Sequence, residues 1–301
     1  MVISSETTLS MEELPINDMN GQSYGFVVYR HRAHVTNSSK LRIRGHIRDF
    51  AQVLVNEQLQ TPPITSPKDL EAFGSWCLRY FTLILCLNSS NYVNIVRDAS
   101  FRFGSWKPLI SEDAQSLFDI DIVVENMGRV NFGEPHDFKQ KKGLWEGPVF
   151  LDGVRLSNWQ IIPLEFKSDW VRALRNWKPY QANSSTVPGP LLVRATLSVK
   201  EPIADTFIDM SSWGKGVVFV NGFNLGRYWS QMGPQKTLYL PAPLLRIGEN
   251  TVFNFRKFTK FKLILRVFQI VIYEQYTPSA NVKFSDKPVL GEKRHTKSMD
   301  M

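Results

Sequence analysis

The sequence has 301 residues, of which 43% are hydrophobic and 21% charged, and its formal net charge is +8. This length corresponds to about two typical domains, and the composition excludes a wholly disordered, collagen-like or low-complexity chain. Two cysteines, Cys77 and Cys86, are too few for a disulfide framework or a four-cysteine zinc site. The five histidines lack the paired spacing of a histidine-rich metal site. We therefore expect an ordinary globular protein without a metal ion or other cofactor.

The positive charge is unevenly placed along the chain. Residues 256–301 contain ten Lys/Arg and four Asp/Glu, so +6 of the net charge lies there and only +2 on residues 1–255. A nucleic-acid partner would require a clustered basic patch or a recognition motif, and we find neither. A solvated tail explains the charge, although its lysines could also touch an anionic membrane. The longest apolar run, 80–87, is far shorter than the roughly 20 residues of a membrane-spanning helix, so no span is expected.

The start of the chain and its sequons bear on localisation. Residues 1–6, MVISSE, show neither the basic region nor the apolar stretch of a secretory signal. Three N-x-S/T sequons nevertheless mark candidate N-glycosylation sites at Asn37, Asn88 and Asn183. Such sequons also arise by chance, so the route that the protein takes in the cell stays open at this point.

Short strand-like runs dominate the sequence. They are rich in Val, Ile, Phe, Tyr and Leu and are separated by Gly, Pro, Asn and Ser, which predicts strands joined by turns. The predicted strands are 24–29, 41–47, 51–55, 120–124, 191–199, 206–210, 217–220, 237–240 and 251–255. Only 167–177 and 241–247 have the spacing of short helices. Many short strands with frequent turns favour sandwiches or barrels over alternating β-α units.

Three stretches interrupt this pattern. Residues 183–190, NSSTVPGP, are polar and rich in Pro and Gly, and we place a domain boundary there. Residues 58–116 show neither clean alternation nor helical spacing, and 259–275 mix basic and apolar residues after the last predicted strand. Either of the last two could be a loop, extra strands or sequence foreign to the fold.

The segment 205–255 carries the most information. Its run 217–220, VVFV, is apolar throughout, as in a strand buried on both faces. Asn221-Gly222 follows, and this pair is the strongest short hairpin signal because both residues tolerate positive φ. The strand-like 223–229 comes next, and Gly233-Pro234 turns into another strand at 235–240. The segment therefore predicts a connected set of antiparallel strands with a tight hairpin at its centre.

Residues 217–229, VVFVNGFNLGRYW, and 233–241, GPQKTLYLP, resemble the galactose-binding-like domain of family 35 β-galactosidases, in particular the β-galactosidase-1-like group. Earlier strings resemble that family's first all-β domain: 14–17 (LPIN), 21–25 (GQSYG), 124–133 (VENMGRVNFG) and 142–144 (KGL). The resemblance covers 7–57, 117–257 and 281–291, about two thirds of the chain. It implies an all-β fold of two β-sandwich domains, jelly-roll and galactose-binding-like.

What the resemblance does not cover is the catalytic part of that family. Family 35 enzymes are retaining glycosidases whose two catalytic glutamates lie in a TIM barrel that precedes the β domains. Retention needs two carboxyl groups about 5 Å apart, and a barrel takes about 250 residues. This chain shows no such alternation of strands and helices. The family's acid/base and nucleophile motifs are also absent, so no catalytic residue is carried over.

The resemblance also sets the expected domain limits. We expect a first all-β domain over 7–182 with an atypical insertion at 58–116, a linker at 183–190, a galactose-binding-like domain over 191–257 and a basic, partly disordered tail over 258–301. The stretches 58–116 and 259–275 fall where the resemblance breaks. This pattern favours an incomplete gene model or truncated product over a genuine splice form.

Four side chains are candidate contacts to a sugar or to a neighbouring domain: Trp213, Arg227, Tyr228 and Trp229. The three aromatic rings could stack on a sugar, but core or interdomain packing is the commoner use of such residues. Arg227 could bind a sugar hydroxyl, although tying the hairpin to a neighbouring domain is favoured. Six other polar residues are interpreted as surface groups: Asp119, Asp121, Glu125, His31, His34 and His46.

Two functions remain open from the sequence. The favoured one is the accessory β-domain portion of a β-galactosidase-like glycoside hydrolase, inactive alone and paired with a barrel domain in full-length relatives. The alternative is a stand-alone carbohydrate-binding module for β-galactoside-bearing glycans. The family implies a secretory route, to the lysosome or outside the cell.

Overall fold

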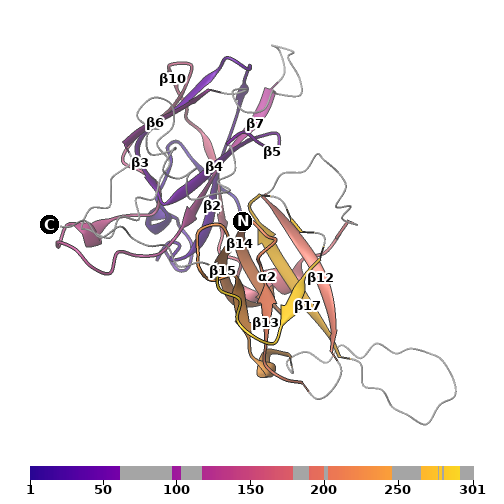
Figure 1. The fold of residues 1–301 in the computed structure, drawn as a ribbon. Helices are drawn as coiled ribbons and strands as arrows, with labels where there is room; N and C mark the ends of the chain where they lie inside the picture. Colours follow the sequence, from indigo (N-terminus) through magenta and orange to yellow (C-terminus); the bar gives the residue numbers. More distant parts are fainter. Residues whose placement is uncertain are drawn as a thin grey trace, which may run out of the picture. The chain divides into compact units, whose positions relative to one another are not determined.

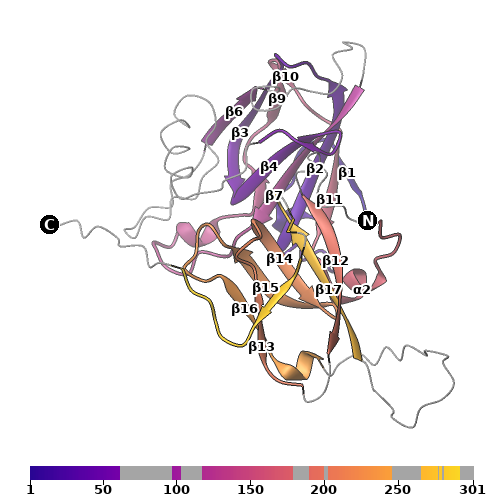
Figure 2. The ribbon, with the colours of Figure 1, turned by 45° about the vertical axis from the view of Figure 1, so that its right-hand side comes forward.

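The computed structural model describes residues 1–61, 97–102, 117–178, 190–199, 203–245, 266–276, 278–279 and 281–291. The chain divides into two compact units, residues 1–165 and 166–301. The described strands of each unit form two antiparallel sheets (Figures 1 and 2). Within the described residues, the only α-helix is the short α2 (Ser168–Ala173), and the 3-10 turns are η1 (Met11–Glu13), η2 (Asp137–Lys139) and η3 (Ala242–Leu245). The predicted all-β fold of two sandwiches is confirmed.

The first unit has a larger and a smaller sheet. The larger has the order β1 (Ile3–Ser5), β11 (Trp159–Leu164), β2 (Gly25–His34), β7 (Leu117–Asn126), β4 (Phe50–Val55) and β5 (Gln58–Leu59). The smaller has the order β10 (Val154–Arg155), β9 (Val149–Leu151), β3 (Lys40–Arg48) and β6 (Arg97–Arg102), and β8 (Gly143–Trp145) also pairs with β3. Strands β2 and β7 pair over ten residues, from Gly25↔Asn126 to His34↔Leu117.

The core of the first unit follows from period-two alternation. In β3, Leu41 and Ile43 are buried while Arg42 between them is exposed, so one face of the strand points inward. Tyr29 on β2 is fully buried, and its hydroxyl donates to Leu9 O at 2.7 Å and accepts from Leu144 N at 3.0 Å. Burial raises the pKa of Tyr29 far above its usual range, so this hydroxyl stays protonated and joins the N-terminal segment to β8.

The structure differs from the expected insertion at 58–116 in two places. Gln58 and Leu59 form β5 on the edge of the larger sheet, and Gln60 and Thr61 after them are buried. Strand β6 pairs with β3 in the smaller sheet, from Lys40↔Arg102 to His46↔Arg97 with one register shift. Strands β5 and β6 therefore belong to the two sheets, while 62–96 and 103–116 lie outside the described residues.

The second unit also has two sheets. One has the order β12 (Leu191–Val199), β17 (Arg266–Glu274), β14 (Lys215–Val220) and β15 (Phe223–Trp229), and the other the order β16 (Thr237–Leu240), β13 (Thr206–Asp209) and β18 (Lys283–Ser285). Their inward faces share one apolar core, formed by Ile208, Met210, Trp213, Val218, Val220, Tyr228, Leu238, Leu240, Leu245, Ile270 and Ile272.

Strand β14 is buried on both faces, as the apolar run at 217–220 predicts. Val218 and Val220 point into the core between the sheets. On the other face, the ring of Phe166 packs against Phe219, with centroids 5.5 Å apart, and against Tyr273, with centroids 5.1 Å apart. Phe166 immediately precedes α2, so this short segment covers the second face of the sheet.

The expected tail at 258–301 contains two strands of the second unit, so this expectation is corrected. Strand β17 lies between β12 and β14, and its residues Ile270 to Tyr273 are all buried. Of the ten basic residues that suggested a tail, five lie at or before the start of this strand and five lie after it. The observed division falls between 165 and 166, ahead of the expected linker at 183–190. Most of that linker and the predicted strand at 251–255 lie outside the described residues.

Asn221 and Gly222 form the predicted two-residue hairpin. Their φ angles are 52° and 81°, and the flanking residues Val220 and Phe223 face each other in β14 and β15. The Asn221 side chain accepts from Gln269 N at 3.1 Å and donates to Leu244 O at 3.0 Å, which ties the turn to its neighbours. The predicted helices are shorter than expected, since 167–177 yields α2 and 241–247 yields η3.

Candidate functional site

A cavity of about 220 Å³ lies beside strands β15 and β16 of the second unit. Three of the four candidate residues line it together: Arg227, Tyr228 and Trp229. The remaining walls come from the connection between the strands and from β16, namely Met232, Gly233, Gln235, Lys236, Thr237 and Leu238. The fourth candidate, Trp213, is not among the lining residues. It is 1% exposed and belongs to the apolar core.

Tyr228 connects this cavity to a buried carboxylate on β17. Its hydroxyl donates to Glu274 Oε2 at 2.8 Å, and the same oxygen accepts from Gly214 N at 3.1 Å. The other oxygen accepts from Tyr276 N at 2.8 Å and from Lys215 N at 3.2 Å. Glu274 is fully buried, and this burial raises its pKa to about 7 despite the four donors. Burial likewise raises the pKa of Tyr228, with Glu274 adding to the shift.

Glu274 was not among the candidate residues identified from the sequence. Glu274 lies within residues 259–275, and the basic residues of this stretch argued against a strand there. One sequence signal could have identified Glu274: it ends the largely apolar run VFQIVIY. If that run is a central strand covered on both faces, the glutamate side chain must be buried. A buried carboxylate of this kind must be hydrogen-bonded, as it is here.

The indole ring of Trp229 in the cavity wall contacts a buried lysine ammonium group. Trp229 is half-buried, and Lys215 Nζ lies 5.0 Å from the centroid of its ring, within the range of a cation–π interaction. Lys215 is itself 2% exposed. Arg227 is exposed, and the Lys236 ammonium donates to Ser230 O. The cavity thus combines the indole ring of Trp229 with the cationic side chains of Arg227 and Lys236.

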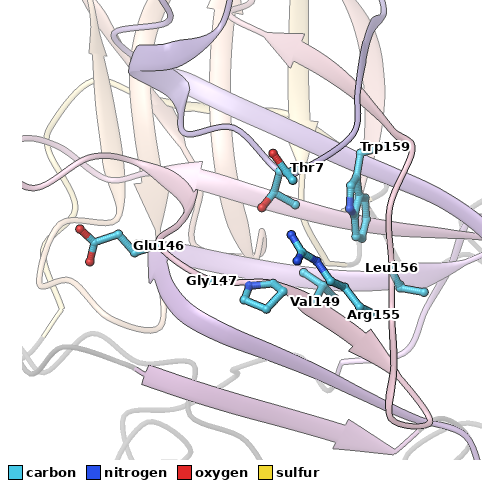
Figure 3. A pocket seen from close by; sticks show the side chains of 9 residues that line it. Thr7, Glu146, Gly147, Val149, Arg155, Leu156 and Trp159 are labelled. Carbon is cyan, nitrogen blue, oxygen red and sulfur yellow. The ribbon is translucent and has the colours of Figure 1, made fainter.

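The first unit has a cavity of its own, of about 290 Å³. Figure 3 shows its side chains, with Thr7, Arg155 and Trp159 around one space and the Glu146 side chain pointing away from it. The complete lining is Thr7, Thr8, Glu146, Gly147, Pro148, Val149, Arg155, Leu156 and Trp159. None of these residues was singled out from the sequence, because they come from three separate segments that carry no common motif.

The acidic residues of β7 differ from the solvent-facing interpretation. Asp121 and Glu125 are 5% and 2% exposed, so the surface prediction is wrong for these two. Asp121 accepts two hydrogen bonds from the Arg30 guanidinium at 2.7 Å, and Asp119 accepts one from Arg32 at 2.7 Å. Strand register explains this, because Arg30 and Arg32 on β2 lie directly opposite Asp121 and Asp119. The Arg32 hydrogen bond holds the pKa of Asp119 below its usual value.

The three histidines have different environments. His46 is 4% exposed, stacks on Trp145 with centroids 4.9 Å apart and places Nε2 at 3.2 Å from Glu146 Oε2, so its predicted surface position is wrong. His31 is half-buried and His34 exposed. Asn37 lies in the turn between β2 and β3 and is partly exposed. Four residues lie outside the described part: Asn88, Asn183, Cys77 and Cys86.

The described residues contain neither a candidate metal site nor a candidate membrane-spanning helix. Their His, Cys, Asp and Glu side chains form no group of three that could hold a metal ion. No helix in this part of the chain has the length and apolar character needed to cross a membrane.

Comparison with known proteins assigns both units. Residues 105–165 match the family model "Beta-galactosidase, first all-beta domain", and 190–250 match "Beta-galactosidase, galactose-binding domain". Beta-galactosidase-1-like protein 2 of Homo sapiens is 33% identical over 98% of this chain and 36% of its own length. Beta-galactosidase-1-like protein 3 of Homo sapiens is 31% identical over 96% of this chain and 34% of its own length. Beta-galactosidase 17 of Arabidopsis thaliana is 32% identical over 84% of this chain and 33% of its own length.

These alignments extend the resemblance found from the sequence. It covered about two thirds of the chain, whereas the match to Beta-galactosidase-1-like protein 2 runs through nearly all of it. The matched part is about a third of the length of each of these relatives. The chain is therefore similar to β-galactosidases over nearly its whole length, and the two matching family models describe their first all-beta domain and their galactose-binding domain.

Proposed function

We propose that the chain is the accessory β-domain portion of a β-galactosidase-like glycoside hydrolase and has no glycosidase activity of its own. The main supporting observation is that one β-domain model matches within each of its two folded units, while the chain spans about a third of its relatives' length. Its role is then to support a separate catalytic barrel that acts on β-galactoside-bearing glycans. The family favours a secretory route for such a protein.

The state of the acidic residues supports this proposal. A retaining glycosidase needs two carboxyl groups about 5 Å apart that can reach the sugar. Asp119 and Asp121 are engaged by Arg32 and Arg30. Glu274 is fully buried beneath Tyr228 and accepts four hydrogen bonds. These carboxylates serve the packing of the sheets, which is the expected use of acids in a supporting domain.

A projecting loop of the first unit supplies a surface for the rest of such an enzyme. Residues 131–136, between β7 and η2, are all exposed. Phe132 in this loop is 80% exposed and Phe138 in the adjoining η2 is 54% exposed, so two neighbouring aromatic rings face solvent. Exposed apolar patches of this kind mark contact surfaces. The proposal assigns this loop to contact with the catalytic barrel.

A domain graft tests the accessory role. The matching region of Arabidopsis Beta-galactosidase 17 is deleted, or replaced by this chain, and hydrolysis of a chromogenic β-galactoside is measured. We expect the graft to restore the activity that the deletion removes. We also expect Phe132→Ser with Phe138→Ser to reduce the yield of active graft, whereas Phe223→Ser on the second unit, where the ring is about as exposed as that of Phe138, does not. A soluble graft that is no more active than the deletion would contradict the role.

A second candidate function is carbohydrate binding by the second unit alone. The observation that favours it is the cavity where Arg227, Tyr228 and Trp229 meet. Binding of the isolated chain to galactose-terminated glycans on an array, abolished by Arg227→Ala with an unchanged melting temperature, would place this function first. Absence of such binding, together with a successful graft, would leave the accessory role alone.

A further inference from the structure

Arg155 differs from three other arginines of the first unit in its interactions. It ends the short edge strand β10, and its side chain is exposed at the 290 Å³ cavity (Figure 3). Arg30, Arg32 and Arg129 of the same unit each pair with a carboxylate. Within the described residues, the Arg155 guanidinium has no ion pair or hydrogen bond. Its five N–H donors are therefore available to a ligand in the cavity.

The cavity behind Arg155 combines an apolar wall with hydroxyl groups. Trp159, Leu156 and Val149 are buried and form its inner side. Thr7 and Thr8 contribute hydroxyl groups at the rim, and in Figure 3 Thr7 lies across the space from Arg155. Each hydroxyl can donate one hydrogen bond and accept two. A ligand in this space would meet apolar surface on one side and polar groups on another.

The one acidic residue of the lining does not oppose an anionic ligand. The Glu146 side chain points away from the cavity in Figure 3, and its carboxylate lies 3.2 Å from His46 Nε2. His46 is in turn fixed by stacking on Trp145. The charge that faces the cavity is therefore the positive charge of Arg155.

The size and chemistry of the cavity define its ligand. A volume of about 290 Å³ is at the lower end for small-molecule sites, which begin near 300 Å³, and suits one sugar ring. A planar guanidinium matches a carboxylate with two parallel hydrogen bonds. We propose that this cavity binds a single acidic sugar residue, a pyranose that carries a carboxylate. Arg155 binds the carboxylate, Thr7 and Thr8 bind ring hydroxyls, and the wall at Trp159 contacts the apolar face of the ring.

This site is separate from the proposed function, because it uses only residues of the first unit and no property of a catalytic barrel. It is tested on the complete chain by titration with glucuronate and with glucose, a matched pair that differs in the carboxylate. We expect saturable binding of glucuronate in the millimolar range, typical of one sugar ring, by NMR chemical-shift changes. Glucose should bind at least about tenfold more weakly, because the charged hydrogen bonds are lost.

Three variants locate the binding. Arg155→Gln should weaken glucuronate binding about tenfold, since a charge-assisted pair is worth about that factor. Arg32→Gln makes the same charge change at another exposed arginine of the unit and should leave binding unchanged. Thr7→Val should weaken glucuronate binding but leave acetate binding unaltered, because acetate has no ring hydroxyls. All three residues are exposed, and equal melting temperatures would confirm that the variants are folded.

Several results would overturn the proposal. Absence of saturable glucuronate binding, equal affinity for glucose, or equal loss in Arg155→Gln and Arg32→Gln would each do so. Acetate that displaces glucuronate at equal concentration would show an anion site without sugar recognition, which also contradicts it.

Discussion

The two units differ in the partners of their buried acidic side chains. In the first unit, acidic groups are paired with cations, as in Arg30–Asp121 and Lys142–Asp49. In the second unit, Glu274 is bound by three backbone N–H groups and the Tyr228 hydroxyl, all neutral donors. Burial raises the pKa of Glu274 and thereby favours its protonated form. Two sandwiches of one chain therefore respond differently to substitution and to pH.

The largest effect should come from the core of the second unit. Trp213 is 1% exposed, so Trp213→Ala should lower the free energy of unfolding by about 3–5 kcal/mol, the usual cost of removing a buried large ring. Trp229 is only half-buried, and Trp229→Ala should cost clearly less. Urea unfolding followed by backbone signals of the second unit measures both. Equal losses would show that Trp229 is as much a core residue as Trp213.

The buried pair of the first unit provides the next largest effect. The Lys142 side chain is 3% exposed, and its Nζ lies 2.7 Å from Asp49 Oδ1. Asp49→Ala would leave a buried ammonium without this partner and should cost about 3 kcal/mol. Asp119→Ala is the matched control, because its partner Arg32 is 66% exposed, and should cost less than about 1 kcal/mol. A small loss in Asp49→Ala would mean that water reaches Lys142.

The dependence on pH should separate the units. Burial raises the pKa of Glu274 from its ordinary value of 4.5 to about 7, so the folded state holds the proton more tightly. Its contribution to stability is complete below pH 4.5 and is lost as pH rises through 7. The second unit should therefore gain up to about 3 kcal/mol as pH falls across this window. Asp119, whose pKa is lowered by Arg32, acts in the opposite direction in the first unit.

Hydrogen exchange between pH 4.5 and 7.5, followed separately for the two units, measures this difference. Glu274→Gln should flatten the pH dependence of the second unit and leave the first unchanged. A second unit that loses stability on acidification would contradict the raised pKa.

The smallest effect concerns the hairpin. Gly222 has φ of 81°, and a Cβ there would lie 2.7 Å from Arg172 Cγ. Gly222→Val should cost about 2 kcal/mol, because a branched residue is strained at this φ. Asn221→Gly keeps the allowed φ but removes the bonds to Gln269 and Leu244, so it reports the side-chain contribution alone. Thermal unfolding compares the two variants, and an unaffected Gly222→Val would indicate that the turn can change its type.

How far the fold could be predicted depended on local signals. Asn221-Gly222 and the run at 217–220 carry their structure within a few residues, and both were predicted correctly. Strand β17 was assigned to a tail because its burial arises from partners on β12 and β14, distant in sequence. Its basic neighbours, Lys260 and Lys262, outweighed the apolar pattern.

The candidate sites were less predictable for the same reason. Arg227, Tyr228 and Trp229 could be found because they adjoin one another in a family motif. The partner of Tyr228 is Glu274, 46 residues further along the chain. Arg155 and Thr7 meet only because β10 and the N-terminal segment approach the same cavity. Long-range pairing of this kind leaves no local pattern in a single sequence.

The most direct test of the central claim, that these are accessory domains, is an assay of the purified chain with a chromogenic β-galactoside. A known β-galactosidase serves as the positive control. The account predicts no turnover above the blank at any pH from 4 to 8. Hydrolysis that follows the protein through purification, and disappears when one carboxylate of this chain is replaced by its amide, would contradict it.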